Sequence, residues 1–285
     1  MRRFVPVVLL LAACATTTTT TTTTTPPPAT PVVATTPCNP GHSILNAVLW
    51  VQSSAEFQAA SRQTYAMARR ALDEALADPT RVGAMEETNA DPAQPPAIVV
   101  DADETVLDNT PFEARVVQAG MTFDEKMWKQ WVAEGNAAAM PGAAEFLRHA
   151  QSRGVTVFYI TNRDEDERPG TLANLQKLGL PLDPNVDTLL LRQDPKMSDK
   201  SPRRKQVADR YRLLLLVGDD LNDFANLRSA SWSERDAFIR QTESWWGTRW
   251  FLVPNPMYGS FERAVIGSGA APCEAVERKV KALNP

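Results

Sequence analysis

Residues 97–109 have the sequence AIVVDADETVLDN, in which an apolar run changes abruptly into acidic and polar residues. The run at 97–100 contains only Ala, Ile and Val, which is the composition of a buried β-strand. Asp101 follows it directly, so the strand is predicted to end in a carboxylate. A buried strand with acidic groups at its carboxyl end is typical of an α/β protein with a ligand site at the edge of its sheet.

The same alternation of apolar runs and helical patterns continues along the chain. A long helical pattern at 44–76 precedes the first strand. Further strands are predicted at 155–160, 188–191, 213–217 and 250–253, and helices at 141–153, 170–178 and 202–210. Apolar strands separated by helices predict a parallel sheet covered on both faces. The expected fold class is therefore α/β.

Polar side chains of one chemical kind follow three of these strands. Asp101 and Asp103 follow the first strand, Thr161 ends the second, and Asp219 follows the strand at 213–217. Carboxylates that meet at one sheet edge raise each other's pKa, and a divalent cation relieves their repulsion. Oxygen ligands favour Mg²⁺. The pattern indicates phosphoryl chemistry in which a carboxylate attacks phosphorus, while a hydroxyl and a lysine hold the phosphoryl oxygens.

Four motifs in this order resemble those of the haloacid dehalogenase superfamily: D-x-D-x-T at 101–105, Thr161, Lys200 and G-D-x-x-x-D at 218–223. The surrounding residues IVVDADETVLDN, FYITNR, DKS and GDDLNDF narrow the resemblance to the class C acid phosphatases. These are outer-membrane lipoprotein acid phosphatases and 5′-nucleotidases. The resemblance implies a Rossmann-like core, in which helices flank a parallel β-sheet, and a small helical cap or additional helical domain.

The resemblance implies a role for each acidic residue. Asp101 would be the nucleophile and would bind Mg²⁺ through its carboxylate. Asp103 would be the general acid and base, and would bind Mg²⁺ through its backbone carbonyl. Asp219 would be the third protein ligand, and Asp223 would orient Lys200 or a metal-bound water. We expect Asp103 to be protonated beside an ionised Asp101, which would give an acidic rate optimum.

The same resemblance assigns the groups that would hold the phosphoryl oxygens. Thr161 and Lys200 would bind them directly, with Asn162 and Arg163 nearby as substrate-binding residues. Lys196 competes with Lys200 for this role. The residues that follow Lys200 have the spacing of the family motif, and this spacing favours Lys200 over Lys196.

Aromatic residues are the candidates for substrate specificity. Trp128 lies in the segment 123–131, where the superfamily places small caps, and Tyr258 lies in the late stretch PNPMYG. By resemblance to the nucleotidases, their rings would stack on a nucleobase or a pyridine ring. The alternative is that Trp128 and Trp131 belong to the apolar face of a helix.

The N-terminal residues predict export. A signal peptide is expected at 1–13, and the sequence LAAC that ends at Cys14 resembles a bacterial lipobox, in which the cysteine carries lipid. An ordinary secretory signal is the alternative. A Thr/Pro-rich linker at 14–40 would hold the domain off the membrane. The expected location is the bacterial cell envelope, where Ala15 favours the outer membrane.

The rest of the chain is expected to divide into a helical segment at 41–96 and a phosphatase domain at 97–285, with a cap insertion around 110–140. Cys38 and Cys273 flank this region. In an oxidising compartment such a pair favours a disulfide, and two free buried thiols are the alternative. The sequence leaves a homodimer open.

Composition excludes several other classes of protein. The 30 Lys and Arg against 34 Asp and Glu give a net charge of −4, so no nucleic-acid partner is expected. The basic run at 203–205 is interpreted as a solvated helix face. Two histidines and three cysteines exclude a multi-histidine metal cage and a four-thiolate cluster.

The sequence therefore predicts a Mg²⁺-dependent acid phosphatase. Its substrates would be small phosphomonoesters such as nucleoside 5′-monophosphates, hydrolysed through an aspartyl-phosphate intermediate. The alternative is a binding module of a surface lipoprotein, either an adhesin or a small-ligand carrier built on a phosphatase scaffold.

Overall fold

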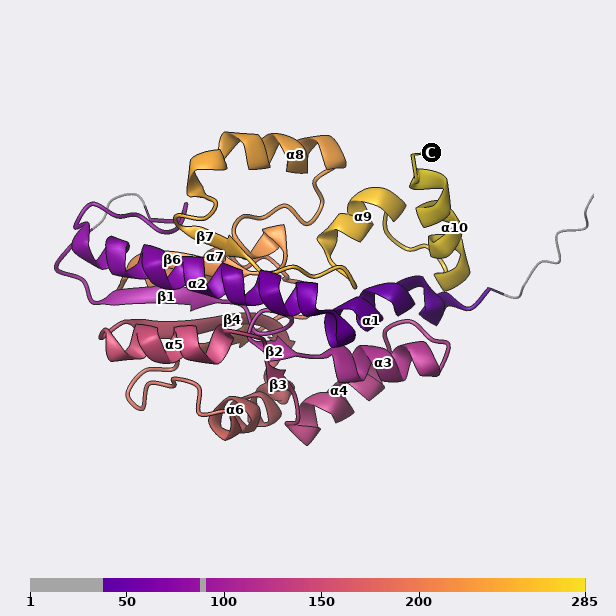
Figure 1. Ribbon diagram of the computed structural model, residues 1–285, viewed down its shortest axis with the longest axis horizontal. Helices are drawn as coiled ribbons and strands as arrows, with labels where there is room; N and C mark the ends of the chain where they lie inside the picture. Colours follow the sequence, from indigo (N-terminus) through magenta and orange to yellow (C-terminus); the bar gives the residue numbers. More distant parts are fainter. Residues whose placement is uncertain (1–37, 88–90, 285) are drawn as a thin grey trace, which may run out of the picture. The chain divides into compact units, whose positions relative to one another are not determined.

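A five-stranded parallel sheet forms the centre of the computed structural model, which describes residues 38–87 and 91–284 (Figure 1). The strands lie in the order β5-β4-β1-β6-β7. They are β1 (Pro96–Val100), β4 (Thr156–Asp164), β5 (Leu189–Arg192), β6 (Arg212–Gly218) and β7 (Trp250–Leu252). Each strand in this order pairs in parallel with the next, so the predicted parallel α/β sheet is confirmed.

Strand β4 is longer than the sequence predicts. The apolar pattern ends before Thr161, but the strand continues to Asp164, which pairs with Arg192 of β5. The side chains of Asp164 and Arg192 form an ion pair at 2.7 Å, which compensates for the polar composition of this strand end. Because alternate residues of a strand face opposite sides, Thr161 and Arg163 point to one side and Asn162 to the other.

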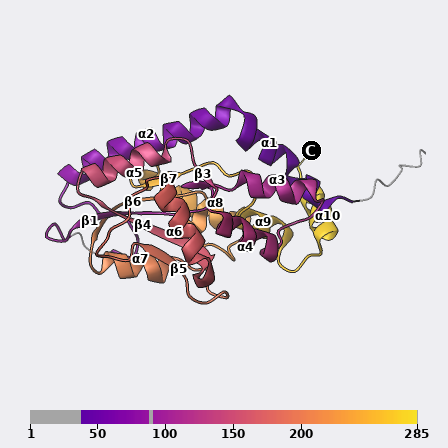
Figure 2. The same ribbon diagram turned by 90° about the horizontal axis from the view of Figure 1, so that it is seen from below.

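Helices cover both faces of the sheet (Figure 2). They are α1 (Leu45–Ser53), α2 (Ala55–Ala77), α3 (Thr110–Gln118), α4 (Glu125–Glu134), α5 (Ala143–Ser152), α6 (Arg168–Lys177), α7 (Ser201–Ala208), α8 (Trp232–Gln241), α9 (Ser260–Ile266) and α10 (Pro272–Ala282). Four short 3₁₀ turns accompany them: η1 (Pro40–Ile44), η2 (Glu165–Glu167), η3 (Leu221–Asp223) and η4 (Glu243–Trp245). Ile98 and Val100 of β1 join the core beneath α2 and α5, whereas Ala97 and Val99 join the core beneath α7.

The helical pattern before the first strand forms two helices. Ser54 separates them with an extended backbone, and its hydroxyl accepts a hydrogen bond from the Phe57 N–H at 3.0 Å, which caps α2. Helix α2 then packs against β6, β7 and α5. The predicted helical segment at 41–96 is therefore part of the same compact unit as the sheet.

Two helices occupy the region where the cap was expected. They lie between β2 (Leu107–Asp108) and β3 (Ala138–Ala139), which pair with each other in an antiparallel ladder. The Asp124 side chain caps α4 by accepting a hydrogen bond from the Met127 N–H at 2.8 Å. Because β2 and β3 pair, the segment leaves the core and returns at one place, which fixes α3 and α4 near the sheet edge.

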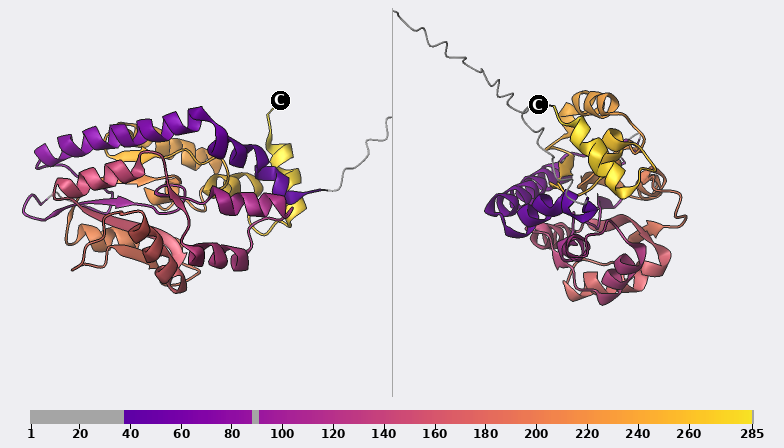
Figure 3. Two further views of the ribbon diagram at one scale, coloured as in Figure 1. Left: turned by 60° about the horizontal axis from the view of Figure 1, so that its bottom comes forward. Right: turned by 90° about the vertical axis from the view of Figure 1, so that its right-hand side faces the viewer.

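Cys38 and Cys273 are joined by a disulfide bond, with their Cα atoms 6.0 Å apart. The bond connects the start of the described chain to α10, which contacts η1 (Figure 3). A cross-link over 235 residues removes conformational entropy from the unfolded chain, and for loops of this length the entropic model gives about 5 kcal/mol. Of the two alternatives left by the sequence, the structure has the disulfide.

The expectations for the N-terminus fall outside the described residues. These are the signal peptide at 1–13, the lipidated Cys14 and nearly all of the linker at 14–40. Within residues 38–87 and 91–284, no helix has the length and apolar character needed to cross a membrane.

Candidate active site

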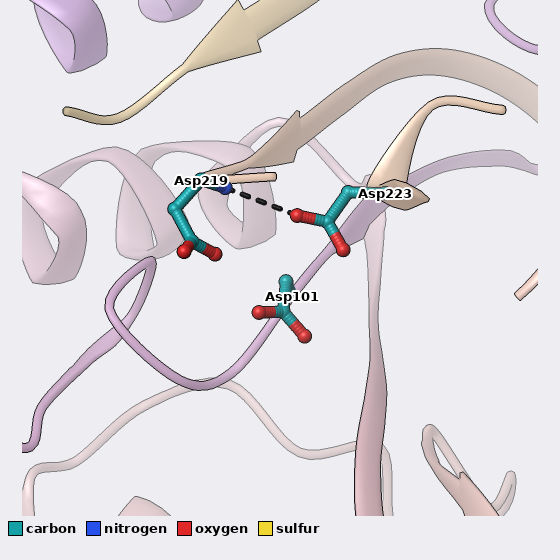
Figure 4. A group of neighbouring side chains, drawn as sticks. All are labelled: Asp101, Asp219 and Asp223. Atoms are coloured by element: carbon teal, nitrogen blue, oxygen red, sulfur yellow. Dashed lines mark hydrogen bonds between the residues drawn. The ribbon is translucent and has the colours of Figure 1, made fainter. Parts of the chain in front are cut away.

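The carboxyl ends of β1 and β6 bring three carboxylates together. Val100 of β1 lies opposite Val217 of β6, and the Asp101 N–H donates a hydrogen bond to the Val217 carbonyl at 3.0 Å. Figure 4 shows Asp101 close to Asp219 and Asp223, and one carboxylate oxygen of each lies within 4.8 Å of the others. The two stretches that were predicted to meet at one sheet edge therefore do so.

Lys200 lies between two of these carboxylates. Its side chain is buried, and Nζ donates hydrogen bonds to Asp101 and, at 2.6 Å, to Asp223. Burial acts to lower the pKa of Lys200, but the charges of Asp101 and Asp223 outweigh it and raise that pKa above its ordinary value. Lys196 is exposed in a turn. The structure thus brings Lys200, and not Lys196, to the carboxylates.

Asp223 is fixed by the loop that follows β6. One of its oxygens accepts hydrogen bonds from the backbone N–H groups of Asp219 at 3.0 Å and Asp220 at 2.9 Å, and the other accepts from Lys200. A Cβ at Gly218 would lie only 2.3 Å from the Asp223 side chain, so this position requires glycine. Asp223 therefore orients both the loop and the Lys200 ammonium.

Asp219 is held by two groups from distant parts of the chain. The Thr105 hydroxyl donates to Oδ1 at 3.1 Å, and the Asn255 amide donates to Oδ2 at 2.8 Å. Burial raises the pKa of Asp219 well above its ordinary value, and the neighbouring carboxylates add to the rise. Burial also raises the pKa of Asp101 to about 7, against the opposing charge of Lys200. With the protein's own charges alone, both carboxyl groups hold their protons to a higher pH than an ordinary aspartate, and a cation would displace those protons.

Asp103 lies in a different environment. Arg163 donates to its Oδ1 from Nε at 3.0 Å and from Nη2 at 2.8 Å, Asn109 donates at 2.8 Å, and the Thr161 hydroxyl donates to Oδ2 at 3.3 Å. Burial acts to raise the pKa of Asp103, but the charge and hydrogen bonds of Arg163 outweigh it and lower that pKa. For the protein's own charges, these pKa shifts run opposite to the expected protonated Asp103 beside an ionised Asp101, because Arg163 stabilises the ionised form of Asp103.

A cleft of about 860 Å³ opens at this sheet edge and reaches the cap helices. Trp128 and Tyr258 both line it. The Trp128 ring lies 5.1 Å from the Phe112 ring and 5.2 Å from the Arg163 guanidinium carbon, and the Tyr258 hydroxyl donates a hydrogen bond to Glu104. The cleft therefore combines a floor of carboxylates with an aromatic wall.

The two tryptophans of α4 differ in their surroundings. Trp131 is buried in the core, and its indole N–H donates to the Asn109 side-chain oxygen at 2.8 Å. Trp128 is half-buried and faces the cleft. The alternative of a core residue on a helix face is thus correct for Trp131, while the structure leaves Trp128 available to a ligand.

Comparison with known proteins identifies the family to which this site belongs. The profile of HAD superfamily, subfamily IIIB (acid phosphatase), matches residues 13–261. The class C acid phosphatase from Bacillus anthracis has a similar structure, with a TM-score of 0.77 and 32% identity, and the match covers 87% of this chain and 99% of that one. This chain belongs to the HAD acid phosphatase family.

Two plant proteins are less similar to this chain in sequence. Acid phosphatase 1 from Solanum lycopersicum is 28% identical over 166 residues, which are 56% of this chain and 57% of the tomato protein. The stem 28 kDa glycoprotein from Glycine max is 25% identical over 167 residues, which are 56% of this chain and 58% of the soybean protein. The matched part of this chain thus spans a little over half the length of these curated relatives.

In this member of the acid phosphatase family, Asn162 and Arg163 are engaged with protein groups. The Asn162 amide donates to the Ser198 carbonyl at 3.0 Å and accepts from Arg203 at 2.6 Å. Arg163 uses its remaining Nη1 on the Thr171 hydroxyl at 3.0 Å, in addition to its bonds to the nearby carboxylate. The structure gives both side chains positioning contacts, and direct binding of substrate by them stays a prediction.

The interpretation of the basic run at 203–205 as a solvated helix face is wrong for two of its three residues. Arg204 is fully buried, its Nε donates to both carboxylate oxygens of Glu86 at 3.1 Å, and its Nη1 donates to the Asp223 carbonyl at 3.0 Å. Arg203 is half-buried and donates to a backbone carbonyl of β4. The sequence could not show this, because Glu86 lies 118 residues before Arg204.

Three further residues of the acid phosphatase site were not predicted from the sequence. Asn255 binds Asp219, Asn109 binds Asp103, and the buried Glu104 adopts a left-handed φ of 56° at the turn after β1. Asn109 and Glu104 lie in the stretch 97–109, where their closeness to Asp103 in the sequence already indicated a place in the site. Asn255 carried no such signal, because only the pairing of β7 beside β6 brings it near Asp219.

Proposed function

We propose that this protein is an acid phosphatase that hydrolyses phosphomonoesters, with the Asp101 carboxylate as nucleophile and Mg²⁺ as cofactor. The observation that carries the proposal is the buried contact between Asp101 and the Lys200 ammonium at the floor of the cleft. The contact supports the proposal, because a carboxylate can attack phosphorus while the neighbouring ammonium holds the attacked phosphoryl group. The Bacillus anthracis relative, solved with tungstate bound, supports the proposal, because tungstate is a tetrahedral oxyanion like phosphate.

The residues that would hold the cation are Asp101 and Asp219, through their carboxylates, and Asp103, through its backbone carbonyl. This donor set fits Mg²⁺, because it consists of oxygens and because burial raises the pKa of both carboxylates. When bound, Mg²⁺ would neutralise charge on the phosphoryl oxygens and favour the ionised ligands.

In the first step, an Asp101 oxygen attacks phosphorus while the bond from phosphorus to the leaving oxygen breaks. Asp103, when protonated, gives its proton to that oxygen, so the products are an aspartyl-phosphate and an alcohol. Lys200 and the Thr161 hydroxyl donate hydrogen bonds to the phosphoryl oxygens. In the second step, Asp103 takes a proton from the attacking water, and inorganic phosphate leaves as the Asp101 carboxylate is restored.

The proposed substrates are small phosphomonoesters that carry a planar ring, nucleoside 5′-monophosphates in particular. The aromatic wall of the cleft supports this, since a base that stacks on a side chain such as Trp128 gains ~1–3 kcal/mol. A panel of AMP, nicotinamide mononucleotide, pyridoxal phosphate and p-nitrophenyl phosphate tests the preference. Each of the four carries a planar ring, so equal activity on all four would contradict the preference for nucleotides.

The decisive experiment measures phosphate release from p-nitrophenyl phosphate with and without EDTA. We expect EDTA to abolish release and excess Mg²⁺ to restore it. Asp101→Asn should be inactive, whereas Asp236→Asn, which changes an exposed carboxylate on α8, should behave like the unchanged protein. If the unchanged protein binds nucleotides without hydrolysing any ester, the alternative of a binding lipoprotein is correct.

We also propose that the chain is anchored to the cell envelope through lipid on Cys14, in the outer membrane. The lipobox-like sequence LAAC ending at Cys14 supports this, together with the Thr/Pro-rich stretch that follows it. Mass spectrometry of the protein from membranes should find the N-terminus at Cys14 with acyl chains attached. Cys14→Ser should release the protein from the membrane fraction, and a Cys14→Ser variant that stays there would contradict the anchor.

A further inference from the structure

Glu113 of α3 is a buried carboxyl group that the protein leaves without a partner. It is 8% exposed and lines the cleft. Within residues 38–87 and 91–284, its side chain accepts no hydrogen bond and forms no ion pair. The described side-chain atoms that are sealed from solvent without a partner are Arg81 Nε, Glu87 Oε1 and Arg212 Nε. The Glu113 oxygens are not among these sealed atoms, so solvent in the cleft reaches them.

Because its oxygens open into the cleft, the hydrogen-bond donors to this carboxyl come from solvent or from a bound molecule. Burial raises the pKa of Glu113 to about 7, and the like charge of Glu262 on α9 adds to the rise. Glu262 itself is paired with Lys279 of α10. Lys279 is therefore engaged by another carboxylate, and within residues 38–87 and 91–284 no arginine or lysine forms an ion pair with Glu113.

Glu113 and the reacting groups line the same cleft. Its neighbour Phe112 contacts Trp128, with ring centroids 5.1 Å apart. Trp128 in turn lies under Arg163, which binds Asp103. A molecule whose phosphate lies between Asp101 and Lys200 and whose body lies along the aromatic wall would extend toward α3 and this carboxyl.

We propose that Glu113 binds the hydroxyl or N–H groups of the alcohol that the enzyme releases, and so selects nucleosides over simple alcohols. The proposal rests on the phosphatase function above and deepens it. A carboxyl group offers two oxygens to neighbouring donors, as a ribose diol or the hydrogen-bonding edge of a base presents them. An aryl alcohol such as p-nitrophenol has no hydroxyl or N–H group beyond the oxygen that is bonded to phosphorus.

The test is Glu113→Gln, which keeps the shape and removes the charge. We expect kcat/KM for AMP to fall about tenfold relative to that for p-nitrophenyl phosphate, while the Tm rises because an unpartnered buried carboxyl is gone. The exposed Glu277→Gln of α10 is the matched control and should change neither quantity. Ribose 5-phosphate separates the two sources of donors: an equal loss assigns the contact to sugar hydroxyls, and a loss confined to AMP assigns it to the base.

Two results would overturn this assignment. An unchanged ratio of the two kcat/KM values would show that Glu113 does not contact the leaving group. A fall in Tm would show that the protein itself supplies a partner for the carboxyl. Failure of the phosphatase proposal is a separate result, because it would appear as no hydrolysis of p-nitrophenyl phosphate by the unchanged protein.

Discussion

Arg163 binds the Asp103 carboxylate through two nitrogens, with Nε at 3.0 Å and Nη2 at 2.8 Å from the same oxygen. Burial alone would raise the pKa of Asp103, yet the charge and bonds of Arg163 lower it. The group proposed as general acid is thus held in its ionised form near neutral pH. Under the proposed mechanism it gains its proton only in acid, which supplies a physical reason for an acidic optimum.

The first prediction concerns pH and the leaving group. Because the pKa of Asp103 is lowered, we expect kcat/KM for an alkyl phosphate, measured with enough Mg²⁺ to saturate the site at each pH, to rise as the pH falls from about 8 toward about 5. p-Nitrophenyl phosphate should give a flatter profile, since its leaving group needs little protonation. Arg163→Met raises the pKa of Asp103 and should move the rise for alkyl phosphates to higher pH. A level alkyl-phosphate profile from pH 5 to about 9 would contradict the assignment.

The Arg163–Asp103 pair also predicts how stability depends on pH. A carboxyl whose folded-state pKa is lowered stabilises the fold above its unfolded-state pKa, and this contribution is lost as the pH falls through the folded-state value. Urea unfolding of the unchanged protein should therefore show a loss of stability in acid that is smaller in Arg163→Met. Equal losses of stability in the two proteins would show that the Arg163–Asp103 pair does not cause this pH dependence.

The second prediction concerns Lys200. Lys200→Met leaves Asp101 and Asp223 buried without their cation, and breaking such a pair costs ~3–5 kcal/mol of unfolding free energy. Lys205→Met removes an exposed lysine from α7, the helix that begins after Lys200, and should cost less than ~1 kcal/mol. Urea unfolding at neutral pH measures both. A cost for Lys200→Met as small as that of the control would show that the carboxylates are already neutral.

The third prediction concerns the competition between Mg²⁺ and protons. Burial raises the pKa of Asp101 to about 7 and that of Asp219 well above its ordinary value, so both carboxyls must lose protons to bind a cation. The increase in Tm caused by Mg²⁺ should therefore be large at about pH 8 and small at about pH 5. Thermal unfolding with and without Mg²⁺ at each pH measures it. An increase that does not depend on pH would place the cation elsewhere.

The fourth prediction tests the buried pair beneath α7. Arg204→Met leaves Glu86 without its partner and should cost ~3–5 kcal/mol, although Arg204 touches no proposed substrate group. Adding Glu86→Leu should recover a large part of that loss, because an apolar pair replaces an ion pair. Arg240→Met on the exposed face of α8 is the control and should stay within about 1 kcal/mol. Equal stability of Arg204→Met and the control would contradict the burial of Arg204.

The fifth prediction concerns the aromatic wall. Trp128→Ala should raise KM for AMP about tenfold or more, the loss expected for one stacked base, and should change KM for p-nitrophenyl phosphate much less. Trp232→Ala removes an exposed tryptophan from α8 and should leave both KM values unchanged. Steady-state kinetics with AMP and with p-nitrophenyl phosphate measure these KM values. Equal changes for both substrates would mean that Trp128 supports the cap and does not contact a base.

Local patterns were sufficient for most of the fold. The apolar runs predicted all five strands of the sheet, because a buried strand needs apolar side chains on both faces along its length. They failed at the end of β4, where Asp164 and Arg192 pair across two strands and make a polar segment acceptable within the sheet. They also failed at Arg204, because a charge pattern cannot show that a carboxylate 118 residues away will compensate for burial.

By itself, the sequence determined which polar side chains follow the apolar runs: these are Asp101, Thr161 and Asp219, and chain direction alone brings the ends of such runs to one edge of a parallel sheet. Only the tertiary structure decided how each of them is charged. Asp101 and Asp103 are two residues apart in the chain, but Arg163 reaches one of them and not the other, and their pKa values move in opposite directions. Protonation depends on distances between groups that are remote in sequence, and those distances exist only in the folded chain.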